Sequence, residues 1–254
     1  MDAAYPLAGL VVGFLVGLTG VGGGALMTPL LILVFGITPS VAVGTDLLYA
    51  GITKSGGVAV HRHQGTVDWP IALWLMCGSL PAAGLTLVCL RTGLITTSHL
   101  DTLISGLLGA ALMLTALVLL LKKYLRSLVG RRQNLEHQSV PLTVAVGAFL
   151  GMVVTLTSVG AGALGAAALF LLYPRLSSAR VVGTDLAHAV PLTLVAGLGH
   201  LQLGNVDTGL LFGLLMGSLP GIYLGSRLSA GLPEAVLRPI LASLLAVIGT
   251  VMVW

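Results

Sequence analysis

The stretch that decides the fold reads LTGVGGGAL at residues 18–26 and returns as LTSVGAGAL at residues 156–164. Each copy lies inside an apolar segment of 30 residues or more, at 7–36 and 141–173. Glycines continue a helix poorly, because glycine loses the most backbone freedom on folding. We therefore expect each long segment to break at its glycines.

Further matches show that the chain is a tandem repeat. Three more motifs recur in the same order: VGTDL at 43–47 and 182–186, HRHQGTVD at 61–68 and HLQLGNVD at 200–207, and GSLP at 78–81 and 217–220. All pairs are separated by 138 or 139 residues. Internal repeats in a membrane chain are typical of secondary transporters. We divide the chain into a first membrane repeat (1–121), a basic cytoplasmic linker (122–140) and a second membrane repeat (141–254).

The composition indicates a membrane protein. Of 254 residues, 56% are hydrophobic and 8% are charged, whereas a soluble globular domain carries about 25% charged residues. This composition excludes a disordered chain, a nucleic-acid-binding domain and almost any cytosolic enzyme. The net charge of +4 fits the excess of Lys and Arg in the cytoplasmic loops of membrane proteins.

The apolar residues fall into eight segments, at 7–36, 41–60, 69–90, 100–121, 141–173, 181–200, 206–228 and 233–254. Six of them have the length of one spanning helix, and the first and fifth are the glycine-broken ones. We expect an all-α polytopic membrane protein in which each repeat has one broken, re-entrant-like segment and three spanning helices.

The distribution of basic residues favours inverted repeats. The arms of the broken segments, about 12 or 13 residues each, are too short to span about 30 Å, so each half would cross three times. Of the 12 Lys and Arg residues, Lys54 then lies inside a segment, Arg91 lies alone on one side, and the other ten lie on the linker side. Four crossings per half would give a split of six to five. The positive-inside rule prefers the first arrangement, with both termini outside.

A glycine break exposes the first N–H groups of the helix that follows it. These groups have no partner inside the helix, and the helix dipole favours an anion there. Inverted symmetry would place two such ends near the middle of the membrane, where transporters hold substrate. The alternative is that the glycines only let helices pack closely. We predict that substrate is bound by residues of the breaks, of the VGTD motifs and by one lysine: Thr19, Gly22, Gly23, Gly24, Thr157, Ser158, Gly160, Gly162, Thr45, Thr184 and Lys54.

Two aspartates inside apolar segments are predicted to act in coupling. Asp46 and Asp185 occupy the same place in the two VGTDL motifs, and His188 follows Asp185 on the same helical face. Carboxylates are costly in lipid and usually mark ion or proton pathways, and His titrates near neutral pH. Tyr49 stands at the position of His188 in the first half. The alternative is that the aspartates cap broken helices.

The remaining polar residues give weaker signals. Lys54 is the only lysine inside a span, so it could neutralise an anion, pair with Asp46 or extend towards the membrane interface. His61, His63 and His200 are expected to be solvated, and an HxH motif is too little for a metal site. The sequence has no phosphate-binding motif and no arguable nucleophile–base pair, so we expect neither an enzyme nor a cofactor.

At LTGVGGGALMTPLL (18–31), with its degenerate copy at 156–169, the chain resembles the sulfite exporter TauE/SafE family, also called toluene-sulfonate uptake permeases. The resemblance includes VGTDLLYAGITKSGG (43–57), VGTDLAHAVPLTLVAGLGH (182–200) and both GSLP motifs. It implies a bacterial inner-membrane permease, coupled to an ion, for sulfite, sulfoacetate or other organosulfonates. The second copy departs from the pattern, because Ala161 interrupts its glycines and no proline matches Pro29. The two pockets are therefore expected to be unequal.

The sequence thus predicts a proton- or ion-coupled secondary transporter for a small sulfur-containing anion, with that solute and the lipid bilayer as partners. Two alternatives stay open. One is a divalent-metal or other cation permease that uses the same Asp and His side chains as ligands. The other is a non-transport membrane assembly subunit. The sequence also leaves open the direction of transport and whether the protein forms a homo-oligomer.

Overall fold

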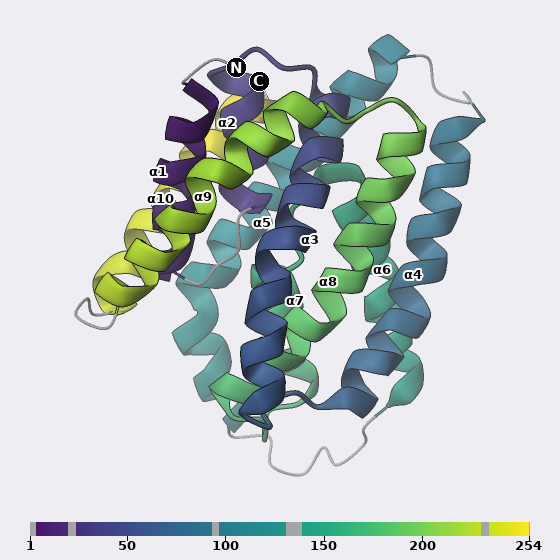
Figure 1. The fold of residues 1–254 in the computed structure, drawn as a ribbon. Coiled ribbons are helices and arrows are strands. Elements are labelled where there is room, and N and C mark those ends of the chain that lie inside the picture. The colour runs from purple at the N-terminus through teal and green to yellow at the C-terminus, as the bar shows by residue number, and fades with distance from the viewer. Residues whose placement is uncertain (1–3, 20–23, 93–96, 131–138, 230–233, 254) are drawn as a thin grey trace.

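Ten α-helices make up the described part of the chain, which is residues 4–19, 24–92, 97–130, 139–229 and 234–253 of a computed structural model (Figure 1). These ranges contain no strand. In chain order the helices are α1 (Ala4–Thr19), α2 (Gly24–Leu33), α3 (Pro39–His63), α4 (Trp69–Arg91), α5 (Thr97–Gly130), α6 (Val140–Thr157), α7 (Ala163–Leu172), α8 (Ser178–Gln202), α9 (Thr208–Ser229) and α10 (Glu234–Val253).

Both glycine-broken segments divide into two helices, as their sequences predict. The first gives α1 and α2 and the second gives α6 and α7, which is why eight apolar segments correspond to ten helices. With 10 residues each, α2 and α7 are too short to span a bilayer. However, α1 has 16 residues because it begins at Ala4, before the apolar segment, and α6 has 18. The prediction that arms of 12 or 13 residues are too short to span is wrong for α6, which is long and apolar enough to cross a membrane.

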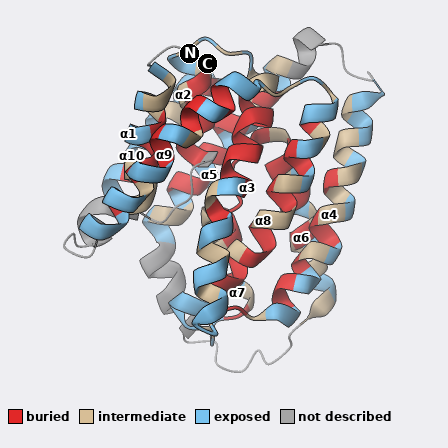
Figure 2. Cartoon of the chain, in the orientation of Figure 1, coloured by how far each residue is buried: buried red, intermediate tan, exposed pale blue. Residues whose placement is uncertain are grey.

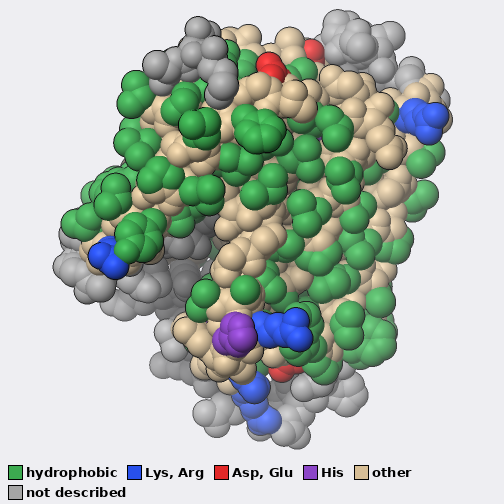
Figure 3. All heavy atoms as spheres, in the orientation of Figure 1, with side chains coloured by type: hydrophobic (Ala, Val, Ile, Leu, Met, Phe, Trp, Pro, Cys, Tyr) green, Lys and Arg blue, Asp and Glu red, His purple; other side chains and the backbone are tan. Residues whose placement is uncertain are grey.

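The surface and the helix lengths are those of a multi-pass membrane protein. Five helices are long and apolar enough to cross a membrane: α4, α6, α8, residues 101–121 of α5 and residues 208–228 of α9. Leu85 and Phe212 are each 67% exposed, and many other large hydrophobic side chains are exposed as well. Figure 3 shows such side chains covering the visible face, with the charged ones towards its edges. A continuous apolar exterior of this kind fits contact with lipid rather than with water.

The two halves of the chain are interlocked. α1 packs along α9, α3 along α8, α4 along α6 and α5 along α10, so each of these pairs joins one half to the other. The expected repeats at 1–121 and 141–254 therefore share one core and are not separate bodies. In addition, α5 continues to Gly130, so the first nine residues of the expected linker at 122–140 are helical.

Glycines at equivalent positions allow two of these helix pairs to approach closely. A Cβ atom added at Gly13 of α1 would lie 2.7 Å from the Cα of Ser218 in α9. One added at Gly151 of α6 would lie 2.7 Å from the Cα of Ser79 in α4. Both values are below any normal contact, so these positions accept no side chain. The seam between α1 and α9 thus repeats the seam between α6 and α4, as expected for small residues at membrane-helix interfaces.

α3 and α8 lie side by side at the centre of the bundle (Figure 1), and Figure 2 shows much of their length buried. α3 is buried without interruption from Ala42 to Gly51. α1 begins and α10 ends at one end of the bundle, whereas α5 ends and α6 begins at the opposite end (Figure 1). The polar residues of α3 and α8 are therefore held inside the protein, shielded from lipid.

Candidate functional site

The two VGTD motifs lie on α3 and α8 and make equivalent contacts between the halves. Thr45 Oγ1 accepts a hydrogen bond from the N–H of Asp207 at 3.1 Å, and Thr184 Oγ1 accepts one from the N–H of Asp68 at 2.9 Å. Asp207 and Asp68 in turn accept hydrogen bonds from the first turns of α9 and α4. The two hydroxyls predicted to bind substrate are thus already engaged in fixing the helix starts of the other half.

Asp46 is fully buried and has a hydroxyl partner. Thr28 of α2 donates a hydrogen bond to Asp46 Oδ2 at 2.5 Å, while Asp46 Oδ1 has no partner among the described residues. The hydroxyl of Ser158, in the second glycine break, is close enough to interact with Asp46 electrostatically but makes no hydrogen bond of normal geometry. Part of the second half therefore faces a carboxylate of the first.

Asp185 occupies the equivalent place on α8 and lacks the partner that Asp46 has. The position that corresponds to Thr28 is Ala166, which has no hydroxyl. The carboxylate of Asp185 instead lies against Gly165 of α7, where an added Cβ would lie 3.0 Å from Asp185 Cγ. Within the described chain Asp185 Oδ1 makes no hydrogen bond, and the residue is 3% exposed.

Neither aspartate is the N-cap residue of the helix that carries it. The residues at the N-cap positions of α3 and α8 are Thr38 and Ser177, and each aspartate lies two turns further along its helix. The alternative that the aspartates cap the helices next to the breaks stays a prediction, because Asp185 lies against Gly165 in the first turn of α7. Buried carboxylates are costly in a membrane protein and usually mark ion or proton pathways.

His188 and Tyr49 each face the serine of a GSLP motif in the other half. His188 Nε2 lies 2.9 Å from Ser79 Oγ in α4, and its Nδ1 has no partner in the part of the chain that is described. Tyr49 faces Ser218 of α9 in the equivalent way, although its hydroxyl makes no hydrogen bond of normal geometry there. His188 bonds to α4 and makes no hydrogen bond to Asp185.

Lys54 connects α3 to the second glycine break. It is 7% exposed, and its ammonium group donates a hydrogen bond to the carbonyl oxygen of Ala161. It also interacts electrostatically with Asp185 and with Asp46. The lysine therefore does not extend to the membrane interface, and it interacts with both repeated carboxylates.

The second glycine break presents unused hydrogen-bond donors. Ser158, Gly160 and Gly162 have φ angles of 57°, 117° and 144°, so the chain turns through conformations that favour glycine. Thr157 uses its hydroxyl within the break, bonding to Val153 O and Val159. By contrast, the Ser158 hydroxyl has no partner, and within the described residues no acceptor is found for the amides of Ala163 and Leu164 at the start of α7.

Only the two ends of the first glycine break belong to the described residues. Gly22 and Gly23 lie outside the described residues. Thr19 ends α1 and Gly24 begins α2, and only their helical backbone is described. The predictions for these four residues are not tested.

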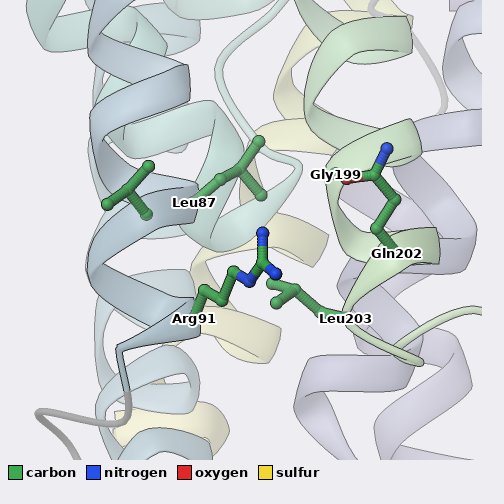
Figure 4. A pocket seen from close by; sticks show the side chains of 6 residues that line it. Leu87, Arg91, Gly199, Gln202 and Leu203 are labelled. Carbon is green, nitrogen blue, oxygen red and sulfur yellow. The ribbon is translucent and has the colours of Figure 1, made fainter.

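A separate cavity of about 240 Å³ opens between the ends of α4 and α8, away from the buried cluster (Figure 4). Figure 4 shows the guanidinium of Arg91 directed among Leu87, Gln202 and Leu203. From the sequence, Arg91 is informative only about topology. Because it ends α4, its charge lies at the end of the bundle opposite to the end of α3.

The histidines near helix ends do not assemble a metal site. Within the described residues no group of three or more His, Cys, Asp or Glu side chains is arranged to hold a metal ion. His61 bonds to Thr66, its Nδ1 lying 2.7 Å from the hydroxyl oxygen. His200 was expected to be solvated; it is in fact fully buried, with Nε2 3.0 Å from the carbonyl oxygen of Thr155.

Comparison with known proteins decides the family. The profile described as "Sulfite exporter TauE/SafE" matches residues 5–252. The chain belongs to the sulfite exporter TauE/SafE family. Proteins with similar sequences include the probable membrane transporter protein YjnA of Bacillus subtilis, 42% identical over 210 residues and 82% of each chain. Another is YdhB of the same organism, also named a probable membrane transporter protein, 27% identical over 81% of this chain and 79% of its own. No solved structure matches the chain.

Sequence reasoning about this TauE/SafE member found the carboxylates, the lysine and the breaks but missed their partners. Thr28, Ser79 and the carbonyl of Ala161 contact the predicted residues and were not predicted. For Thr28 the sequence does hold a signal. In the alignment of the two glycine-broken stretches Thr28 corresponds to Ala166, so the halves differ at this position.

Proposed function

We propose that this TauE/SafE family transporter carries a small sulfur-containing anion, such as sulfite or an organosulfonate, across the bacterial inner membrane together with a proton or another ion. The observation that carries the proposal is the meeting of Lys54 with the second glycine break. A buried cation, the Ser158 hydroxyl, which makes no hydrogen bond of normal geometry, and two amides without an acceptor among the described residues at the start of α7 are groups suited to an oxyanion. The family description, which names sulfite, supports the substrate class.

Inverted repeats would give this site access to both sides of the membrane. We propose that each half crosses three times and that α2 and α7 return to the face from which α1 and α6 enter. Three features support this topology. The seams between α1 and α9 and between α6 and α4 repeat each other. The first helix of the first half, α1, begins at one end of the bundle, and the first helix of the second half, α6, begins at the opposite end (Figure 1). Most basic residues fall on the linker side, which the positive-inside rule makes cytoplasmic.

The carboxylates would provide coupling. An anion that enters the cluster adds negative charge next to Asp185 and Asp46, and protonation of one carboxylate restores the original balance. His188 lies one turn from Asp185 on α8 and would help to transfer this proton along the helix face.

A cation permease is supported less well. Asp46, Asp185 and His188 would have to converge as ligands, whereas His188 bonds to Ser79 and Asp46 bonds to Thr28. Lys54 interacts with both carboxylates and would repel a cation.

Uptake by proteoliposomes tests the proposal. Purified protein is reconstituted, and uptake of radiolabelled sulfite and sulfoacetate is followed with and without an inward proton gradient, with empty liposomes as the control. We expect uptake of at least one of these anions that the gradient increases and that Zn²⁺ does not inhibit. Uptake of Zn²⁺ in place of either anion would establish the cation permease instead. If the protein moves neither the anions nor Zn²⁺, the transport proposal is wrong for these substrates.

A further inference from the structure

We infer that the two repeats are functionally unequal: the anion binds at the second glycine break beside Lys54, and Asp185, not Asp46, takes up the accompanying proton. This inference rests on the proposed function for the identity of the anion. It goes beyond that function because it assigns binding and protonation to one half of a duplicated site.

The first argument is the difference between the two carboxylates. The hydroxyl of Thr28 donates to Asp46, and a donor of this kind stabilises the ionised carboxylate. Asp185 has Ala166 at the equivalent place and no partner for Oδ1 among the described residues. With less stabilisation of its charge in an equally buried position, Asp185 is the carboxylate that gains a proton when the local charge becomes more negative.

The second argument is that only one repeat supplies a cation. The residue that corresponds to Lys54 is Thr193, whose hydroxyl donates within its own helix to Ala189 O at 2.9 Å. An ammonium group has three donors, so Lys54 can keep its bond to Ala161 and still bind an anion. The Ser158 hydroxyl lies in the same break, is 2% exposed and makes no hydrogen bond of normal geometry, although it is close to Asp46.

The third argument is the charge balance around Asp185. The titratable group that faces Asp185 from a neighbouring element is Lys54 of α3, and Lys54 in turn interacts with Asp46 and with His188. Residues 140–172, which form α6, the break and α7, contain no titratable side chain. When one anion pairs with Lys54 and one proton binds to the Asp185 carboxylate, the total charge of the cluster is unchanged. One proton then accompanies each singly charged anion.

Labelling with dicyclohexylcarbodiimide tests the inequality without any substrate. This apolar reagent adds to protonated carboxyl groups, and mass spectrometry of the digested protein locates the adduct. We expect Asp185 to be labelled at least about tenfold faster than Asp46 near pH 6. Ala166→Thr should protect Asp185 by supplying the missing hydroxyl, and Thr28→Ala should make Asp46 reactive. Equal labelling of both aspartates, or no protection by Ala166→Thr, would overturn the assignment of the proton.

Binding of radiolabelled sulfite to the purified protein tests the place of the anion. We expect Lys54→Met to weaken binding at least about tenfold, because a charge-assisted hydrogen bond is lost. Thr193→Val, the matched change in the other half, should leave binding within about twofold. Full binding by Lys54→Met would exclude the second break as the site. If the unaltered protein binds neither sulfite nor sulfoacetate, the proposed substrate is wrong, and the carbodiimide result still decides whether the two carboxylates differ.

Discussion

At the scale of single residues, Asp46 and Asp185 have the same neighbours in sequence and different neighbours in space. If Asp185 carries the coupling proton, Asp185→Asn should reduce proton-driven uptake at least about tenfold, because Asn keeps the size of the side chain but cannot ionise. Asp46→Asn should keep most of the uptake, since its amide oxygen can still accept from Thr28. Uptake rates in proteoliposomes across a series of pH values measure both variants. An unchanged rate and pH profile for Asp185→Asn would leave this aspartate with a structural role only.

The threonines of the VGTD motifs are predicted to stabilise the fold. Thr45→Val and Thr184→Val each remove the acceptor of one backbone amide, which should cost about 1–3 kcal/mol of stability. Because the contacts are equivalent, the two variants should lower the unfolding midpoint in detergent by similar amounts. Weaker sulfite binding at unchanged stability would instead support the sequence-based prediction that these hydroxyls bind substrate.

The sequence identified the polar residues of the site but not their contacts. Repetition of VGTD inside apolar segments was enough to single out Asp46 and Asp185, because a carboxylate is costly inside a membrane and usually has a function there. The bond from Lys54 to Ala161 joins residues 107 positions apart. Such a contact depends on how α3 packs against the second half, which no local pattern contains.

At the scale of helices, the second break is the element on which binding depends. Gly162 has a φ of 144° and precedes the first turn of α7, so Gly162→Leu would strain the backbone and fill space next to the free amides. We expect loss of sulfite uptake by a protein that still inserts into the membrane. Immunoblots of membrane fractions and uptake assays measure the two effects separately.

Gly106→Leu is the control for this change, because an added Cβ at Gly106 meets no atom within 4 Å. It should retain uptake and abundance. Normal uptake by Gly162→Leu would mean that the glycine serves packing alone.

Helix breaks were easier to predict from sequence than helix ends. Runs of glycine disfavour a helix wherever they occur, so the divisions between α1 and α2 and between α6 and α7 follow from composition. The continuation of α5 to Gly130 was not foreseen, because a helix can extend into a polar segment once its hydrogen bonds are established.

At the scale of the whole molecule, the membrane topology of one half fixes that of the other. The main helix pairs join one half to the other, so the orientation of one half in the membrane cannot change without the other. Inverted repeats predict that reporter fusions after Gly130 and after Ser178 lie in the cytoplasm and that a fusion after Trp254 lies outside. Gly130 ends α5, whereas Ser178 begins α8, so the two fusions probe the same end of the bundle through different halves.

Activity of alkaline phosphatase and fluorescence of green fluorescent protein show on which side of the membrane each fusion lies, because the first protein works outside and the second in the cytoplasm. An outside position at Ser178 would require α6 and α7 together to cross the membrane. That result would make the repeats parallel and would remove the symmetry on which access from both sides depends.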